Sequence, residues 1–274
     1  MKTEDLLGQP RSVEITRIEK ENSKVRTIFF DVPRPELNVQ AGQFLMVWVP
    51  GIDEIPMSIS LWMKPSMSIT VLPIGEATES MAGLKKGDLI GVRGPFGTSF
   101  DLTSKRALVV GGGIGIAPLR PLVHDLLKYG SDVTLIAAAK SANELVFVDE
   151  FGRITSDRFE LRVATNDGSV GFKGLATGAA EEYIAENQVD LIYTCGPEPM
   201  MARLFNLAKE KNVGFRASLE RYMKCGCGIC GTCAMDPSGE LVCVDGPVFT
   251  GDQLAKMTEF GKYHRDSTGI RREF

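Results

Sequence analysis

Four cysteines near the C-terminus constrain this chain more than any other feature. Cys225, Cys230, Cys233 and Cys243 follow the spacing C-x4-C-x2-C-x9-C. Plant-type ferredoxins use this spacing to hold a [2Fe–2S] cluster through four thiolates. A protein with such a cluster moves single electrons, so the rest of the chain must supply their source and their destination.

The loop that carries these cysteines has the composition to wrap tightly around a compact cluster. Three glycines separate its cysteines: Gly226, Gly228 and Gly231. Glycine reaches positive φ at little steric cost, which lets backbone N–H groups point at the sulfur atoms. We expect Cys243 to return from a hairpin whose turn is the Asp-Pro-Ser-Gly stretch at 236–239. Cys227 breaks the spacing and is interpreted as a bystander.

Zinc and disulfides are the alternatives for these cysteines. A structural zinc site usually has two C-x2-C pairs, whereas this stretch contains one. Disulfides are less favoured because the start of the chain, MKTEDLLGQPRS, has no apolar signal core. The same observation favours a cytoplasmic protein.

The composition is that of an ordinary globular protein. The 274 residues are 43% hydrophobic and 24% charged, with a formal net charge of −4. No apolar run is long enough to span a membrane, and no basic stripe indicates nucleic-acid binding. This length accommodates two domains and a small appendage.

The hydrophobic pattern predicts three parts. Residues 1–102 contain alternating segments such as SVEITRIEKE and KVRTIFFDV, which predict an antiparallel β-barrel. Residues 103–218 alternate short apolar strands, such as ALVVGGG and DVTLIAAA, with helical stretches, which predicts a doubly wound parallel sheet. Residues 219–274 carry the cysteines and a polar tail, and are expected to form a small C-terminal [2Fe–2S] domain.

Two loops at the ends of predicted parallel strands are candidates for nucleotide binding. The first contains four glycines and leads into a helix: Gly111, Gly112, Gly113 and Gly115. Such a loop lets a phosphate approach the backbone and the helix N-terminus, although a tight structural turn is the alternative reading. The second contains Cys195, Gly196 and Pro197, and Cys195 is open to a purely structural role as a small buried residue.

The order of barrel, GGGIGIAP and CGPEPMM resembles the ferredoxin–NADP reductase superfamily. The stretch SLERYMKCGCGICGTC and the later VCVDGPVF are similar to the electron-transfer subunit of class 1B dihydroorotate dehydrogenase, as is TNDGSVGFKG at 165–174. This resemblance implies a relay from NADH to FAD, then to the cluster, and then to the FMN of a separate catalytic subunit in pyrimidine (UMP) biosynthesis. It implies a heterotetrameric complex, with no catalytic acid or base in this chain.

The resemblance also implies where FAD binds in the barrel. The first flavin segment contains Pro56, Met57, Ser58 and Ile59, where Ser58 resembles a serine near the reactive flavin nitrogen. The second segment, which in the family lies along the pyrophosphate, contains Gly75, Glu76, Ala77 and Thr78. The family arginine before the first segment is replaced here by Ile55. The alternative for both segments is a plain strand and turn.

Three points stay open at this stage. A related electron-transfer subunit, of a sulfhydrogenase or an anaerobic sulfite reductase, shares the same relay with another terminal partner. A zinc-bound interaction module without enzymatic activity is the second alternative. NADH is favoured over NADPH, because no arginine cluster follows AAAKSANE at 137–144.

Overall fold

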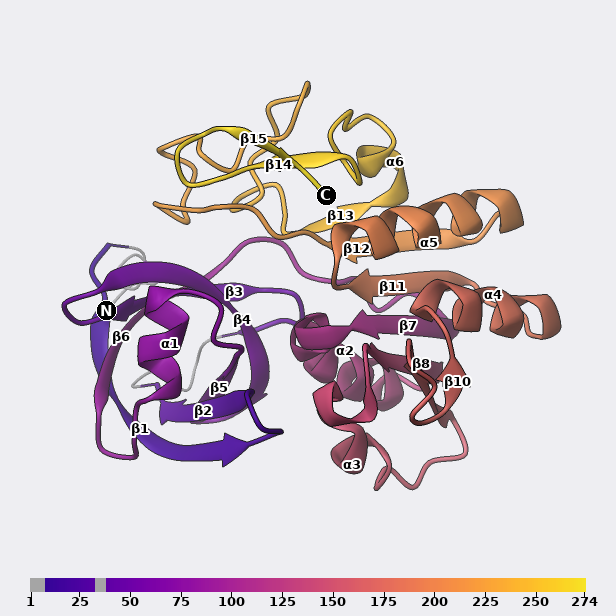
Figure 1. The fold of residues 1–274 in the computed structure, drawn as a ribbon, viewed down its shortest axis with the longest axis horizontal. Helices are drawn as coiled ribbons and strands as arrows, with labels where there is room; N and C mark the ends of the chain where they lie inside the picture. The colour runs from indigo at the N-terminus through magenta and orange to yellow at the C-terminus, as the bar shows by residue number, and fades with distance from the viewer. Residues whose placement is uncertain (1–7, 33–37) are drawn as a thin grey trace.

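The N-terminal part of the protein is a closed six-stranded barrel, as predicted (Figure 1). The computed structural model describes residues 8–32 and 38–274. The barrel strands are β1 (Arg11–Lys20), β2 (Arg26–Asp31), β3 (Phe44–Val49), β4 (Asp53–Met63), β5 (Ser66–Val71) and β6 (Leu89–Phe96). They close in the order β1-β2-β5-β4-β3-β6, with antiparallel neighbours throughout.

The period-two pattern of the sequence explains the barrel. In β1, Val13 and Ile15 are buried while Glu14 faces solvent. These apolar side chains join one core cluster with others such as Phe30 and Ile69. Helix α1 (Glu76–Ala82) packs against β3, β4 and β5.

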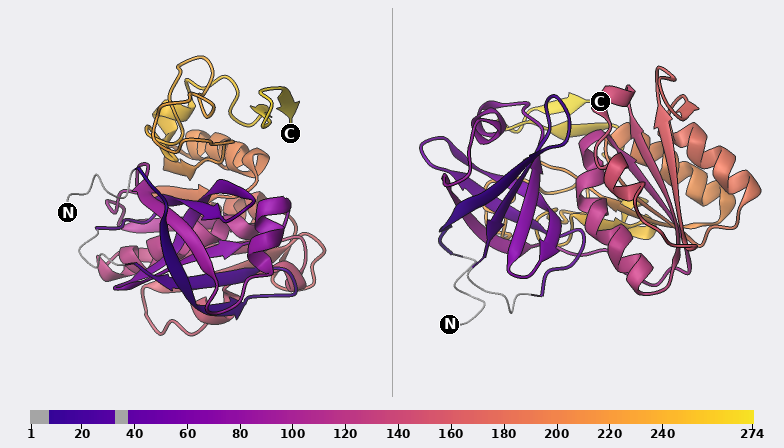
Figure 2. Two further views of the ribbon diagram at one scale, coloured as in Figure 1. Left: turned by 90° about the vertical axis from the view of Figure 1, so that its left-hand side faces the viewer. Right: turned by 90° about the horizontal axis from the view of Figure 1, so that it is seen from below.

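The second part is a parallel sheet with helices on both faces, which confirms the doubly wound prediction (Figure 2). Its strands are β7 (Arg106–Gly112), β8 (Asp132–Ala139), β9 (Phe159–Thr165), β10 (Phe172–Lys173), β11 (Leu191–Cys195) and β12 (Gly214–Ser218). Its helices are α2 (Ile116–Lys128), α3 (Val148–Phe151), α4 (Ala176–Glu186) and α5 (Glu198–Lys211), with short 3-10 turns η2 (Gly113–Gly115) and η3 (Ala142–Glu144).

Alternate residues of β7 divide the core into two layers. Val109 packs with the α2 and α3 side, whereas Leu108 and Val110 pack with the α4 and α5 side. Both faces are covered, and this is why these strands read as continuous apolar runs rather than alternating ones.

The C-terminal part returns to this sheet before it ends. Strand β13 (Val248–Thr250) pairs antiparallel with β12, so the sheet order is β10-β9-β8-β7-β11-β12-β13. The remaining elements are α6 (Gly251–Leu254), β14 (Tyr263–Arg265) and β15 (Arg271–Glu273). The cysteine stretch therefore lies between two strands of the same sheet and is anchored at both ends.

The C-terminal part also contacts the barrel. The backbone N–H of Thr98, just after β6, donates to Gly246 O at 2.6 Å. A Cβ on Gly226 would lie 2.6 Å from Met46 of β3, so the cysteine loop packs directly on the barrel wall. In Figure 1 this part lies across the top of both other parts. None of the helices in the described residues is both long and apolar enough to traverse a bilayer.

Candidate electron-transfer site

The cysteine loop folds around the Cys225 sulfur atom. The backbone N–H groups of Ile229 and Cys230 donate to Cys225 Sγ at 3.3 and 3.4 Å. The hydroxyl of Thr232 donates to Cys230 Sγ at 3.2 Å. Both Gly226 and Gly228 have positive φ, at 69° and 82°, as the tight wrapping requires. Hydrogen bonds to sulfur of this kind adjust the reduction potential of an iron–sulfur cluster.

The predicted hairpin brings the fourth cysteine back to the third. Ala234 and Leu241 form a β-bridge, and the N–H of Gly239 donates to Met235 O at 2.8 Å. As a result Val242 N donates to Cys233 O at 3.2 Å, which places Cys243 beside Cys233. Both of these cysteines are buried, whereas Cys230 is exposed.

The thiols differ in how readily they ionise. Burial opposes the charged form of Cys225, but backbone hydrogen bonds, chiefly from Cys230, lower its pKa to about 6. Burial likewise opposes ionisation of Cys230, but the hydrogen bond from the Thr232 hydroxyl helps to outweigh burial, and the pKa of Cys230 is lowered. Burial and then the neighbouring Cys233 raise the pKa of Cys243 to about 12. A bound cation reverses such a rise, because a coordinating thiol is deprotonated outright.

Cys227 points toward the barrel rather than completing either pair. Its thiol lies within hydrogen-bonding reach of Cys225 and of Arg93, a buried residue of β6. Arg93 is itself held by Glu54 through two hydrogen bonds of 2.6 Å. Burial, and next the Cys225 sulfur, raise the pKa of Cys227. These contacts are compatible with the bystander role, which stays a prediction.

The four predicted ligands fit the donor set of a [2Fe–2S] cluster. Within residues 8–32 and 38–274, no three Cys, His, Asp or Glu side chains converge as ligands of a single metal ion. Instead, Cys225 and Cys230 share one turn, where Cys230 N donates to Cys225 Sγ at 3.4 Å, and the hairpin brings Cys243 beside Cys233. Two thiolate pairs are what a cluster of two irons held by four cysteines requires.

The two predicted nucleotide loops lie side by side at the carboxyl ends of β7 and β11. Gly111 and Cys195 are direct partners in the sheet register. A Cβ on Gly115 would lie 2.5 Å from the backbone of Cys195, so only glycine allows this approach. Ligands of doubly wound sheets bind outside this edge of the sheet. The structure therefore brings the two loops together at the expected edge.

Two residues beside Cys195 were missed by sequence reasoning. Ser218 is the partner of Cys195 in the sheet register. Burial, followed by the nearby Glu220 carboxylate, raises the pKa of the Cys195 thiol. Desolvation by the surrounding protein, followed by the Glu198 carboxylate, raises the pKa of Glu220. No local sequence signal marks Glu220, because its closeness to Cys195 follows from the pairing of β12 with β11.

The predicted flavin segments lie on the barrel. Pro56, Met57, Ser58 and Ile59 all belong to β4, where Pro56 to Ser58 are half-buried and Ile59 is buried. Ile55 packs against the barrel core. Gly75 to Thr78 form the start of α1, where the Thr78 hydroxyl accepts hydrogen bonds from Ile74 N and Gly75 N at 3.0 and 3.1 Å. Helix α2 packs against β4. The strand that carries the barrel segment thus contacts the helix that directly follows the glycine loop.

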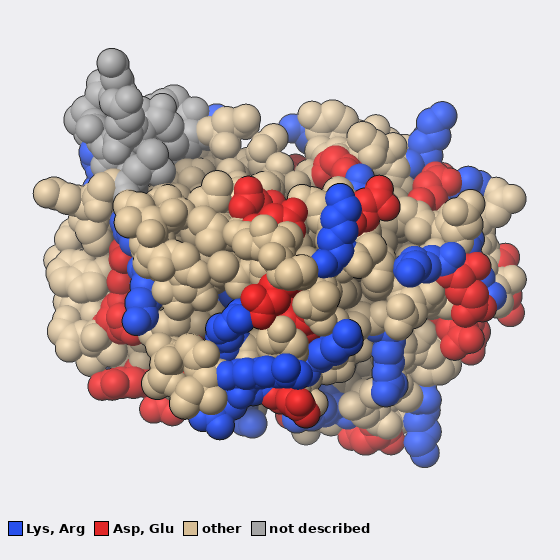
Figure 3. Space-filling view, turned by 90° about the horizontal axis from the view of Figure 1, so that it is seen from above, with Lys and Arg blue, Asp and Glu red and all other residues tan. Residues whose placement is uncertain are grey.

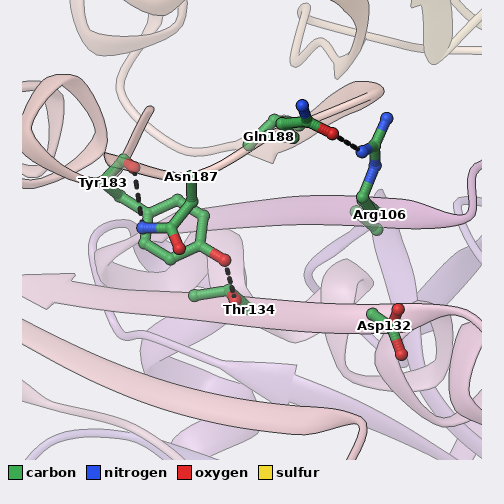
Figure 4. Close-up of a pocket in the computed structure, with 8 residues that line it drawn as sticks. Arg106, Asp132, Thr134, Tyr183, Asn187 and Gln188 are labelled. Atoms are coloured by element: carbon green, nitrogen blue, oxygen red, sulfur yellow. Dashed lines mark hydrogen bonds between the residues drawn. The ribbon is translucent and has the colours of Figure 1, made fainter. Parts of the chain in front are cut away.

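Two hollows in the described part of the chain lie away from the predicted residues. One, of about 310 Å³, lies at the amino ends of β7 and β8, where Arg106 and Asp132 begin the strands (Figure 4). It is at the edge of the sheet opposite the two nucleotide loops. The other, of about 970 Å³, opens between the barrel and α3, and is lined by Met63, Arg120 and Phe147 among others. No predicted cofactor residue lines either hollow.

Comparisons with known proteins agree with these features. Residues 220–255 match the family described as the iron–sulfur cluster binding domain of dihydroorotate dehydrogenase B, and residues 109–204 match an oxidoreductase NAD-binding domain. A protein of Methanocaldococcus jannaschii is 44% identical over 96% of this chain and 98% of its own length. One of Methanothermobacter thermautotrophicus is 42% identical over 97% and 98%. Both are described as probable dihydroorotate dehydrogenase B (NAD(+)) electron transfer subunits.

Solved structures of other oxidoreductases share the fold of this chain. An NADH-dependent reduced ferredoxin–NADP oxidoreductase superposes with a TM-score of 0.79 at 30% identity, covering 92% of this chain and 94% of that one. The cytochrome P450 reductase of Amycolatopsis, at 21% identity and a TM-score of 0.64, shares the fold.

The barrel, the parallel sheet and the iron–sulfur domain define an NAD-linked oxidoreductase subunit of the ferredoxin reductase type. The chain belongs to the family of dihydroorotate dehydrogenase B (NAD(+)) electron transfer subunits. The expected cofactors, FAD, an iron–sulfur cluster and NAD(H), agree with this family and fold.

Proposed function

We propose that this chain passes electrons between NAD(H) and the FMN of a dihydroorotate dehydrogenase catalytic subunit, in the pathway to UMP. When bound, NAD(H) supplies hydride, FAD converts two-electron into one-electron transfer, and the cluster passes single electrons onward. The chain's own residues bind, orient and shield these groups. The proposal keeps the cytoplasmic location and the heterotetrameric assembly expected from the sequence.

Each role is proposed for residues already described. Cys225, Cys230, Cys233 and Cys243 hold the cluster, and the N–H groups of the loop stabilise its sulfur ligands. The nucleotide loops, with their glycines and the Cys195–Pro197 stretch, hold the nicotinamide cofactor at the edge of the sheet. Ser58 and its neighbours on β4, with the start of α1, hold FAD.

One observation supports this proposal above the others: the cysteine loop touches both of the other parts of the molecule. Gly226 packs on Met46 of the barrel, while β13 extends the sheet that carries the nucleotide loops. Met46 pairs with Pro56 of the proposed flavin segment, and β12, the partner of β13, pairs with the strand that ends at Cys195. This placement supports a short path from both proposed sites to a cluster in the loop. A module that only bound zinc needs no such placement.

The surface around the cysteine loop is the proposed contact with the FMN subunit. Ile229 is 84% exposed, Cys230 and Val244 are exposed beside it, and an exposed ligand brings the cluster near the next flavin. Seen from this side, charged groups of both signs are interspersed, and a broad uncharged area lies toward the barrel (Figure 3). Phe249 does not belong to this surface, because it is fully buried in the core beneath.

The runner-up is an electron-transfer subunit of a sulfhydrogenase or an anaerobic sulfite reductase, with the same relay and another partner. The family match over the cysteines, which names dihydroorotate dehydrogenase B, favours the first proposal.

The purified chain tests the relay without its partner. We expect it to contain FAD and two irons, and to pass electrons from NADH to an artificial one-electron acceptor. A colourless, zinc-containing protein would refute the proposal, and so would FMN in place of FAD.

A further inference from the structure

A buried ionic network lies between the CGPE loop and the cysteine loop. At its centre is Arg221, which lies four residues before Cys225 and has a side chain only 4% exposed. Arg221 donates from Nη1 and Nη2 to the Glu198 carboxylate at 2.5 and 3.1 Å, and from Nε to Glu259 Oε1 at 2.9 Å. The side chains of Glu198 and Glu259 are 5% and 1% exposed.

The network reaches the CGPE loop on one side and the cysteine stretch and the C-terminal tail on the other. Glu198 is the first residue of α5 and lies three residues after Cys195. The other oxygen of Glu259 accepts from Asp236 N at 3.1 Å, in the hairpin between Cys233 and Cys243. The tail closes the network, because Gly261 N donates to Glu198 Oε1 at 2.9 Å and Arg265 pairs with Asp236.

The chemistry of this network is unusual for a purely structural contact. Burying charges is expensive, and a well-packed apolar cluster often stabilises a protein as well or better. A fully paired Arg–carboxylate network fixes the relative positions of its members, because the planar guanidinium donates hydrogen bonds only in set directions. Here the fixed geometry joins the nicotinamide loop to both halves of the cysteine loop.

We propose that Arg221 is a positioning residue, which sets the distance and orientation between the cluster and the flavin–nicotinamide site and so controls the electron-transfer step between FAD and the cluster. The inference rests on the proposed function. Arg221 touches no proposed cofactor ligand atom, so it acts through Glu198 on one side and through Glu259 on the other.

The test compares Arg221→Gln and Arg221→Lys with Arg120→Gln. Arg120 is an equally buried arginine with two hydrogen bonds to Glu150, at 2.9 and 2.5 Å, and it lies on the opposite face of the sheet. Anaerobic stopped-flow mixing with NADH reports flavin reduction and cluster reduction separately. In Arg221→Gln we expect cluster reduction to slow by about tenfold or more, as small misplacements of reacting groups do. Flavin reduction, measured at saturating NADH, is expected to slow much less than cluster reduction, and Arg221→Lys recovers part of the loss.

Hydrogen–deuterium exchange provides a second readout that needs no electron flow. In Arg221→Gln, exchange rises together at 195–198 and 222–236, and in Arg120→Gln it does not. If Arg221→Gln fails to fold, Arg221→Lys and Glu259→Gln carry both measurements.

Equal slowing of both steps, or unchanged cluster reduction with the cluster spectrum intact, overturns the positioning role. Exchange confined to the site of substitution also overturns it. The proposed function is judged separately, by whether NADH reduces the cluster of the unmodified protein at all.

Discussion

At the scale of single residues, four cysteine thiolates would carry the proposed cluster, and the loss of one iron ligand is expected to destabilise it. The spacing of Cys225, Cys230, Cys233 and Cys243 predicts a four-thiolate site, and the hairpin places Cys243 beside Cys233. The ligand assignment itself stays a prediction. Glu220 was not predicted, because its closeness to Cys195 arises from the pairing of β11 with β12 and not from any local motif. Arg221 was missed for the same reason, since its partners lie 23 and 38 residues away.

The ligand assignment is tested by a pair of cysteine substitutions. Cys230→Ser removes a thiolate ligand, and we expect loss or severe destabilisation of the cluster. Cys227→Ser is the matched control in the same loop, and we expect it to keep the cluster. Visible absorption and iron content measure both. If the two variants keep the same iron content, the assignment is wrong.

At the scale of elements, periodicity predicted most of the strands and little of what joins the parts. The runs ALVVGGG and DVTLIAAA became β7 and β8, because strands covered on both faces are apolar throughout. Strand β13 was not predicted, since three residues carry too short a pattern, and its pairing depends on a partner some 30 residues earlier. The structure places Phe249, the middle residue of this strand, in the core.

Strand β13 holds the C-terminal end of the cysteine stretch on the sheet, and its buried residue Phe249 is expected to contribute to the stability of the fold. Phe249→Ala removes a fully buried ring, and we expect a loss of about 3–5 kcal/mol in the free energy of unfolding. Denaturant unfolding measures the loss. Val170→Ala, at a side chain 41% exposed, is the control and is expected to cost well under 1 kcal/mol. Equal losses in the two variants would falsify the anchoring role.

The contact between α2 and α3 predicts a pH effect. Burial opposes the charged form of Glu150, but hydrogen bonds from His124 and Arg120 prevail and lower its pKa from 4.5 to about 2. A lowered carboxylate pKa stabilises the fold above pH 4.5, and this contribution is lost as the pH falls from 4.5 toward 2. The lowered pKa of Glu150 contributes at most about 3 kcal/mol to the free energy of unfolding. Because about a third of this side chain is exposed, solvent screening reduces the contribution to about 1–2 kcal/mol.

Glu150→Gln tests this pH effect. The difference in unfolding free energy between the unmodified protein and the variant is expected to shrink as the pH falls from 6 to about 3. Glu181→Gln, at an exposed residue of α4, is the control. A difference that stays constant with pH contradicts the assignment.

At the scale of the whole molecule, the arrangement explains why one chain carries three cofactor sites. The barrel and the sheet are joined by the contact of α2 with β4, and the C-terminal part spans both. The cysteine loop carries Ile229, whose side chain is exposed at the surface of the molecule. The proposed relay therefore runs from the sheet through the barrel to the cysteine loop, whose exposed side is its last step.

The proposed contact surface for the FMN subunit can be altered without changing a proposed ligand of the cluster. We expect Ile229→Ser to weaken binding of the FMN subunit, because central apolar residues carry much of an interface's binding energy. Electron transfer from NADH to an artificial acceptor remains as the internal control. Unchanged binding of the partner would place the contact elsewhere.

The central claim is tested most directly by dihydroorotate turnover with and without a co-expressed FMN subunit. We expect the chain alone to reduce artificial acceptors with NADH and to leave dihydroorotate untouched. The complex is expected to couple dihydroorotate oxidation to NAD⁺ reduction, and to lose this coupling when Cys230→Ser is introduced. Turnover of dihydroorotate by this chain alone, or full coupling in the Cys230→Ser complex, would contradict the account.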